Sequence, residues 1–437
     1  MIRTFFSCFL VVFALSGLTA QHNHDHDGHD HGHNHGIEDP TYGGEDDHQE
    51  DGMGDHAVCH CPDDGSHGLK QFDPGATAIH HISDQNIYTV GPFHVGLPVF
   101  AYAPGATGLS VFSSAYFDAD SHGNSCKAYD RYVLVDGMIR RVMDESFPTG
   151  EIMTGGIKHK LVDHHGDEHL IPFVCYEGRE YETEARSTGD AGLFGGGITG
   201  FYDFSLTKNV VSMLIIFGLL AFVFFRVAGA YKDRQGKAPT GLQNFIEPIF
   251  LFIQDEVAKP FLGHHYMKYL PLLMSIFFFI LGLNLWGQVP FLGGSNVTGN
   301  LAVTAALALI AFFVVNFSGN GHYWKHLLLA PGTPWFVKPI LIPVEILGIF
   351  IKPFTLMLRL FANITAGHMV IIIFISFIFI FGRNGESLGG AAGGAIGSTL
   401  LTLFMMTIEL IVAFVQAFVF TILTASYIGA AIEEAHH

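Results

Sequence analysis

Five apolar segments in the carboxyl-terminal half of the chain limit its fold more than any other feature of the sequence. They lie at about residues 210–227, 271–290, 301–317, 340–381 and 398–432. Crossing the hydrocarbon core of a bilayer takes about 17–25 apolar residues in a helix, and each segment reaches that length. Residues 203–437 are therefore predicted to form an all-α polytopic membrane domain with about five crossings.

The last two apolar segments are longer than one upright crossing needs. They run for about 42 and about 35 residues, and a helix rises about 1.5 Å per residue. The first of them contains Pro343 and Pro353, which can bend a helix. The sequence predicts two long tilted helices and leaves open whether the first is straight or bent.

Charge is distributed unevenly along the chain. Residues 21–206 hold 31 acidic and 9 basic side chains, whereas residues 207–437 hold 9 acidic and 12 basic ones. The net charge of −18 disfavours a nucleic-acid partner, which favours a basic surface. An acidic, water-exposed part is therefore joined near Asp203 to an apolar part whose partner is the lipid bilayer.

The amino terminus resembles a secretory signal peptide. Residues 1–20 combine Arg3, an apolar run at Phe5–Leu15 and the small residue Ala20. The run is too short for a stable membrane span. We expect cleavage near residue 20, with an uncleaved anchor as the alternative.

A segment rich in His and Asp follows at residues 21–67. Its first part alternates His with Asp, Asn and Gly, and such a composition cannot bury a core, so we expect disorder. Neutral imidazoles can hold zinc, copper or nickel weakly. Weak divalent-metal binding and a plain solvated tail both stay open; we expect no other cofactor.

Residues 68–202 are predicted to form a small, mostly-β domain. Strand-like runs lie at Ile87–Val90, Val95–Tyr102, Tyr132–Asp136 and Leu170–Tyr176, separated by Gly and Pro turns. Four cysteines, Cys59, Cys61, Cys126 and Cys175, allow three disulfide connectivities. We expect a Cys126–Cys175 bridge, because both residues lie in the strand-rich stretch.

Basic residues indicate the orientation in the membrane. Arg226, Lys232, Arg234 and Lys237 follow the first apolar segment within a dozen positions. Since loops rich in Lys and Arg stay on the cytoplasmic side, the N-terminal domain is expected in the periplasm and the carboxyl terminus in the cytoplasm. This orientation fits a bacterial inner (plasma) membrane protein.

Ionisable and polar side chains recur inside the two longest apolar segments. These residues are Glu345, Lys352, Arg359, Asn363, His368, Glu409 and Gln416. Ionisable groups at lipid depth are costly and usually mark a pathway or a binding site. Lys352 can extend its charge to the membrane surface, but the others lie too deep for that explanation.

The spacing of these residues favours a proton path. Glu409 and Gln416 are seven positions apart and share one helix face, while His368 lies nine positions after Arg359, half a revolution away. A His–Glu couple can relay protons near neutral pH, whereas Arg keeps its proton and acts as a fixed positive barrier. A static Arg359–Glu409 ion pair is the open structural alternative.

The same residues resemble the signature of subunit a of the F-type ATP synthase. The likeness covers about residues 203–437 and is carried by Lys352–His368, Pro343–Glu345, Asn284 and Glu409–Tyr427. In that family the subunit is the stator beside a rotating c-ring, and two tilted helices follow the ring. The resemblance implies a proton-translocating subunit that has no chemistry on substrates of its own and assembles with the c-ring and b-type peripheral stalk subunits.

The resemblance also assigns roles to single residues. Arg359 would face the carboxylate of the ring, with Gln416 packed near it. His368, Glu409 and Asn363 would line the inlet half-channel. Glu345 would lie near the cytoplasmic outlet.

Residues 21–202 depart from the family pattern. Ile79–Asp84 is similar to the amphipathic segment at the family's amino terminus, so the β domain resembles an insertion between that segment and the first span. The His-rich tract suggests a metal-ion transporter as the alternative function. A sensor or adhesion protein with an inert anchor is a further alternative, disfavoured by five spans and Arg359.

Overall fold

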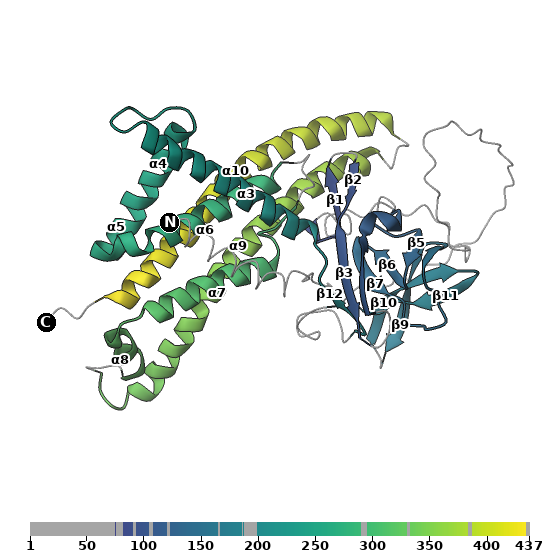
Figure 1. Ribbon diagram of the computed structural model, residues 1–437, viewed down its shortest axis with the longest axis horizontal. Helices are drawn as coiled ribbons and strands as arrows, with labels where there is room; N and C mark the ends of the chain where they lie inside the picture. The colour runs from purple at the N-terminus through teal and green to yellow at the C-terminus, as the bar shows by residue number, and fades with distance from the viewer. Residues whose placement is uncertain are drawn as a thin grey trace.

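The computed structural model describes residues 75, 82–90, 93–104, 108–119, 123–164, 167–185, 187, 199–289, 295–329, 333–382 and 387–433. Figure 1 shows two parts: a β-rich N-terminal domain (described residues between 82 and 203) and a helical domain (Lys208–Glu433). This arrangement confirms the predicted fold class. The predicted signal peptide (1–20) and the His-rich segment (21–67) lie outside the described residues.

The N-terminal domain contains small antiparallel sheets. One pairs β1 (Ile87–Val90) with β2 (Phe93–Gly96), and a second has the order β12 (Tyr202–Asp203), β3 (Pro98–Ala103), β4 (Gly108–Ser113). A third has the order β7 (Met138–Arg141), β6 (Tyr132–Val135), β5 (Lys127–Tyr129), β8 (Glu151–Met153). The fourth has the order β11 (Arg179–Glu182), β10 (Asp167–Tyr176), β9 (Ile157–His164).

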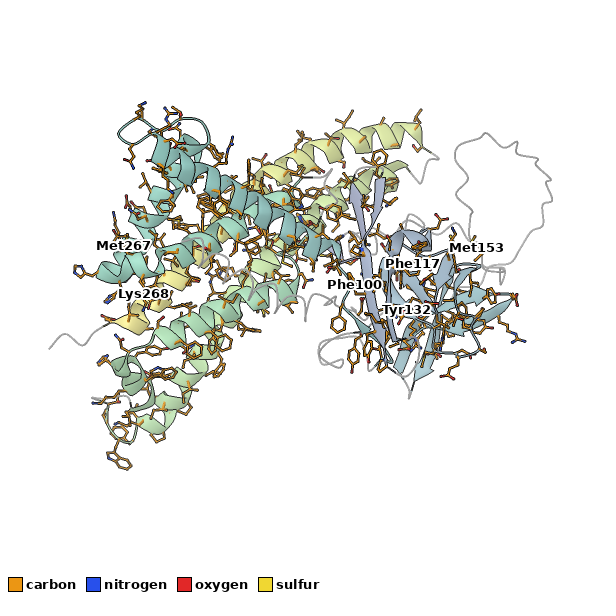
Figure 2. All side chains as sticks on the ribbon, in the orientation of Figure 1. Phe100, Phe117, Tyr132, Met153, Met267 and Lys268 are labelled. Carbon is orange, nitrogen blue, oxygen red and sulfur yellow. The ribbon has the colours of Figure 1, made fainter. Side chains whose placement is uncertain are left out.

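Strand β6 lies between two apolar cores, which is why all four of its residues are buried. Side chains alternate between the faces of a strand. Tyr132 and Leu134 accordingly join one core, and Val133 and Val135 join the other. Figure 2 shows Tyr132 and Phe117 of the first core inside the domain.

The two cysteines of the predicted disulfide each take part in a disulfide bond, and their pairing with each other stays a prediction. Cys126 and Cys175 are both disulfide-bonded and nearly fully buried. Cys175 lies on β10, and Cys126 is the residue before β5.

Five helices of the described residues are long and apolar enough to cross a membrane, as predicted. The helical domain contains α3 (Lys208–Asp233), α4 (Leu242–Phe252), a π-helical turn (Ile253–Ala258), α5 (Lys259–Leu262), α6 (Tyr266–Gly287), α7 (Leu301–Ser318), α8 (Gly321–Leu329), α9 (Lys338–Gly382) and α10 (Leu388–Ile432). The second crossing is one continuous candidate from Leu242 to Gly287. It therefore begins before the predicted 271–290 segment.

Helices α9 and α10 lie side by side and run the length of the helical domain (Figure 1). Each has 45 residues, or about 68 Å at 1.5 Å per residue. Pro343 and Pro353 both lie inside α9, so neither ends the helix. A length of about 68 Å exceeds a bilayer of about 30 Å, and the pair must therefore be strongly inclined in a membrane.

The N-terminal domain lies at one end of the helical domain. Strand β12 leads within a few residues into α3, and Asp84 Oδ1 accepts a hydrogen bond from the Asn209 backbone N–H at the start of α3 (3.2 Å). Figure 2 places Met267 and Lys268, at the start of α6, at the opposite end. The candidate crossings run alternately between these two ends (Figure 1).

Candidate proton-transfer site

The centre of the candidate site is a contact between His368 of α9 and Glu409 of α10. His368 Nδ1 lies 2.5 Å from Glu409 Oε1, and the two side chains are only 12% and 3% exposed. We call them the His–Glu pair. Glu409 Oε1 has no aligned hydrogen-bond donor among the described residues, so the two atoms approach closely without the Nδ1–H pointing at the oxygen. Nε2 lies on the other side of the ring and is available to a second partner.

Gly367 makes this contact sterically feasible. A Cβ atom at this position would lie 3.0 Å from Glu409 Oε1 and 3.3 Å from its Cδ, tighter than ordinary van der Waals contact. Because Gly367 has no side chain, the Glu409 carboxylate can lie against the surface of α9 next to the His368 imidazole. The sequence signal for this close approach is a glycine next to a titratable residue inside an apolar segment, Gly367 before His368.

Polar residues from two other elements support the pair. Asn284 of α6 donates through Nδ2 to the carbonyl oxygen of Ala413, one turn after Glu409 on α10 (3.1 Å). Asn284 Oδ1 in turn accepts from Thr298 Oγ1 in the segment before α7 (2.7 Å). Thr365 Oγ1 of α9 donates to the Gly299 carbonyl oxygen of the same segment (3.4 Å). The residues before α7 therefore connect α6, α9 and α10 next to the pair.

Arg359 lies away from the His–Glu pair. It is partly exposed, and within the described residues no carboxylate lies within ion-pair distance of it. The Arg359–Glu409 ion pair left open by the sequence does not form, because Glu409 instead faces His368. As the helical spacing predicts, Leu360 and Ile364 on the His368 side of α9 are buried, and Asn363 on the Arg359 side is exposed.

The remaining predicted residues do not converge on one cluster. Gln416 is buried two turns after Glu409 on the same face of α10, and Asn363 shares the exposed face of Arg359. Glu345 lies near the start of α9, and its buried Oε2 has no hydrogen-bond partner among the described residues. Their predicted roles therefore stay predictions.

Lys352 has an identifiable partner. Its Nζ lies 5.2 Å from the centre of the Tyr427 ring on α10. A cation over an aromatic face is stabilised by the ring quadrupole. This contact fixes Lys352 within the chain and separates it from Arg359, whose charge has no such partner among the described side chains.

Metal ligands do not cluster in the described part of the chain. Within it, no group of three or more His, Cys, Asp or Glu side chains could hold a metal ion. The His-rich segment and Cys59 and Cys61 lie outside the described residues.

The helical domain matches known proteins. A sequence profile of the family described as ATP synthase A chain matches residues 210–429. A profile of a second family, described only as a domain of unknown function (DUF8433), matches residues 77–164 in the N-terminal domain.

Curated relatives carry the same description as the first family. The chain is 41% identical over 244 residues to an ATP synthase subunit a from Chloroherpeton thalassium. The aligned region covers 54% of this chain and 70% of the relative. It is 42% identical to an ATP synthase subunit a from Prosthecochloris aestuarii over 55% of this chain and 72% of the relative. A protein of the same description from Anaeromyxobacter dehalogenans is 38% identical over 64% of this chain and 70% of its own length.

Proposed function

Since the chain belongs to the ATP synthase A chain family, we propose that it is the stator of a proton path formed with a c-ring. Protons would reach the His–Glu pair, pass to a carboxylate on the ring, and leave the ring on the far side of Arg359. The observation that carries this proposal is the placement of the pair and Arg359 on opposite faces of α9. The chain would transfer protons without acting chemically on any other substrate.

The His–Glu pair supplies the inlet step. Glu409 is almost fully buried against an imidazole, so a proton can move between the two groups without crossing bulk lipid. When one proton passes between the buried imidazole and the buried carboxylate, the total charge of the pair stays the same. Such a couple suits transfer near neutral pH.

Arg359 supplies the barrier and the attraction. A guanidinium keeps its proton in proteins, so it cannot conduct one, yet it favours the ionised form of a nearby carboxylate. No described carboxylate of its own chain neutralises it, and a lone cation at membrane depth is costly. A carboxylate supplied by the ring would remove that cost.

The order of residues along α9 supports two separate half-channels. Glu345 precedes Arg359 by about 21 Å and His368 follows it by about 14 Å, at 1.5 Å of rise per residue. Glu345 lies toward the Lys338 end of α9, away from the N-terminal domain. An outlet near Glu345 and an inlet at the His–Glu pair would therefore open toward opposite sides, with Arg359 between them.

The exposed apolar face of α10 fits a ring of helices. Ile396, Leu400, Phe404 and Ile411 recur at helical spacing and are exposed, on the side away from Glu409 and Gln416. Together with α9, this surface would pack against the ring, while b-type peripheral stalk subunits would hold the chain still. The basic residues at the ends of α3 and α6 away from the N-terminal domain support a cytoplasmic location for that side.

A site-specific photo-crosslinker tests the ring contact in the intact complex. We expect Leu400, 70% exposed on α10, to crosslink to a small, very hydrophobic subunit present in several copies. Phe222, 59% exposed on α3, is the matched control and should crosslink chiefly to lipid or to other partners. Equal ring crosslinking from both positions, or ring crosslinking from Phe222 alone, would contradict the proposed face.

A further inference from the structure

Buried polar atoms without partners gather where the N-terminal domain meets the helical domain. Asn209 is only 1% exposed, yet neither its Oδ1 nor its Nδ2 has a hydrogen-bond partner among the described residues. The same holds for Thr207 Oγ1 and Asn86 Nδ2 close by in the same junction. Buried polar groups are nearly always satisfied, so this junction requires internal water.

A row of hydroxyl groups leads inward from that junction. Ser212, one turn after Lys208 on α3, has its Oγ 2.8 Å from Ser295 Oγ and 3.3 Å from Tyr88 Oη. Its Oγ is also 2.8 Å from the Lys208 carbonyl oxygen, so its one proton is donated either to that carbonyl or to Ser295. Trp286 Nε1 lies 3.3 Å from the same Tyr88 oxygen. An indole N–H only donates, so the Tyr88 oxygen accepts from Trp286 and its own proton can be directed to Ser212.

Tyr88 comes from the N-terminal domain. It lies on β1, whereas Ser212, Trp286 and Ser295 belong to the helical domain. Tyr88 is only 6% exposed, although its hydroxyl is polar. The N-terminal domain therefore places one phenol between the start of α3 and the end of α6.

The inner end of the row meets the His–Glu pair at Gly287. A Cβ atom on Gly287 would lie 3.0 Å from the Ser295 carbonyl oxygen and 3.3 Å from His368 Nε2, so both atoms border the same space. Gln288 follows Gly287 in the chain, and Asn296 follows Ser295. Their side-chain nitrogens, Gln288 Nε2 and Asn296 Nδ2, are buried without hydrogen-bond partners among the described residues. The inner end of the row therefore also requires water, beside His368 Nε2.

We propose that protons reach His368 Nε2 along this junction, through water at its two ends and the hydroxyls of Tyr88, Ser212 and Ser295 between them. Tyr88 is a positioning residue that the N-terminal domain contributes to the path. The inference rests on the proposed function, because it supplies the route to the His–Glu pair.

The proton balance of the route is simple. Each hop breaks one O–H bond and forms the next, and every hydroxyl ends with one proton as it began. A proton that arrives at Nε2 makes the imidazole a cation, and the Nδ1 proton then passes to the Glu409 carboxylate. The imidazole becomes neutral again, now protonated at Nε2. It then rotates, keeping that proton, so that the protonated nitrogen faces Glu409 before the next proton arrives, while Glu409 passes its own proton on.

Removing single hydroxyls from the intact complex in sealed vesicles tests the route. Tyr88→Phe should lower the rate of ATP-driven proton uptake about five-fold, the scale of one hydrogen bond, and Ser212→Ala should act similarly. The double variant should lose little more, because both groups serve one row. Tyr116→Phe, at a half-exposed tyrosine of the same domain, is the matched control and should leave uptake unchanged.

Thiol accessibility separates a wet path from a purely structural contact. Asn209→Cys and Asn296→Cys should react with a small, charged, membrane-impermeant thiol reagent added on the side of the N-terminal domain, and the reaction should stop proton flow. Ser398→Cys, buried between α9 and α10 where Ser398 Oγ donates to the Phe374 carbonyl oxygen (2.5 Å), should stay unreactive. The unsubstituted chain, with its own cysteines, gives the background.

The outcomes distinguish this inference from the proposed function. Full uptake in Tyr88→Phe and Ser212→Ala, with inert cysteines at 209 and 296, would overturn the inferred route. If Arg359→Ala still abolished pumping in the same preparation, the proposed function would stand without this route. Pumping that survived Arg359→Ala would remove the function itself.

Discussion

His368 Nδ1 lies 2.5 Å from Glu409 Oε1, so a titratable group of α9 and one of α10 meet where these two helices pack together. The pair lies half a helical revolution from Arg359 on α9. A single chain thus holds a proton-exchanging couple and a permanent cation on separate faces.

Exchanging the two members of the pair tests whether the couple works as a unit. His368→Ala and Glu409→Ala should each lower ATP-driven proton uptake about 100-fold, the usual scale for loss of a proton-transfer group. The exchanged double variant, His368→Glu with Glu409→His, should recover to within about ten-fold of the unchanged chain. Uptake in reconstituted vesicles is the measurement.

The exchange experiment has a matched control and one outcome that would contradict the prediction. Glu433→Gln, at an exposed carboxylate after α10, should leave uptake unchanged. If the exchanged variant were as inactive as either alanine variant, the two groups would not function as one couple.

Gly367 should tolerate no added methyl group. Gly367→Ala places a Cβ atom 3.0 Å from Glu409 Oε1, so the contact between α9 and α10 must shift, at a cost of about 1–3 kcal/mol. We expect a lower unfolding temperature for the purified chain and slower proton uptake. Gly348→Ala, in α9 with no atom within 4 Å of the added Cβ, is the control; equal behaviour of the two variants would contradict the close approach.

The disulfide bonding of Cys126 and Cys175 should stabilise the N-terminal domain. A disulfide that closes a loop of tens of residues stabilises a fold by about 3–4 kcal/mol through lost unfolded-state entropy. The double variant Cys126→Ala, Cys175→Ala should therefore unfold at a lower denaturant concentration, followed by tyrosine fluorescence of the full chain. An unchanged midpoint would show that the bridge does not limit unfolding.

The His-rich segment should be dispensable for coupling. Deleting residues 21–56 removes most of its imidazoles and should leave ATP-driven proton uptake within about two-fold of the full chain, because the described proton-transfer groups all lie after residue 80. Proton uptake with and without added zinc is the measurement. A loss of proton flow on deletion would give this segment a role in the path.

Much of the architecture was predictable because lipid imposes a simple rule on sequence. A span must be long and nearly uncharged, so the apolar runs predicted five crossings, and the excess length of the last two predicted inclined helices. The β1 boundaries were also predicted correctly. The extent of the second crossing was not, because the apolar run at 271–290 marks only part of the helical stretch Leu242–Gly287, whose first half has mixed polarity.

The site was predictable only as a set of residues. Ionisable groups inside an apolar segment stand out in the sequence because burying them in lipid is costly. Which two of these groups meet, however, depends on how α9 and α10 are rotated about their own axes. The sequence therefore left an Arg359–Glu409 pair open, and the structure pairs Glu409 with His368. The contacts among Tyr88, Ser212 and Ser295 were not foreseen, because they join residues more than 80 positions apart without any local pattern.

Replacing Arg359 is the most direct test of the central claim. The intact complex with Arg359→Ala, reconstituted in sealed vesicles, should assemble normally and hydrolyse ATP but take up no protons, as followed by a pH-sensitive dye. Lys352→Ala, which removes a cation that stacks on Tyr427 of the same chain, should retain most of the uptake. Proton pumping that persisted without the Arg359 guanidinium would contradict the account.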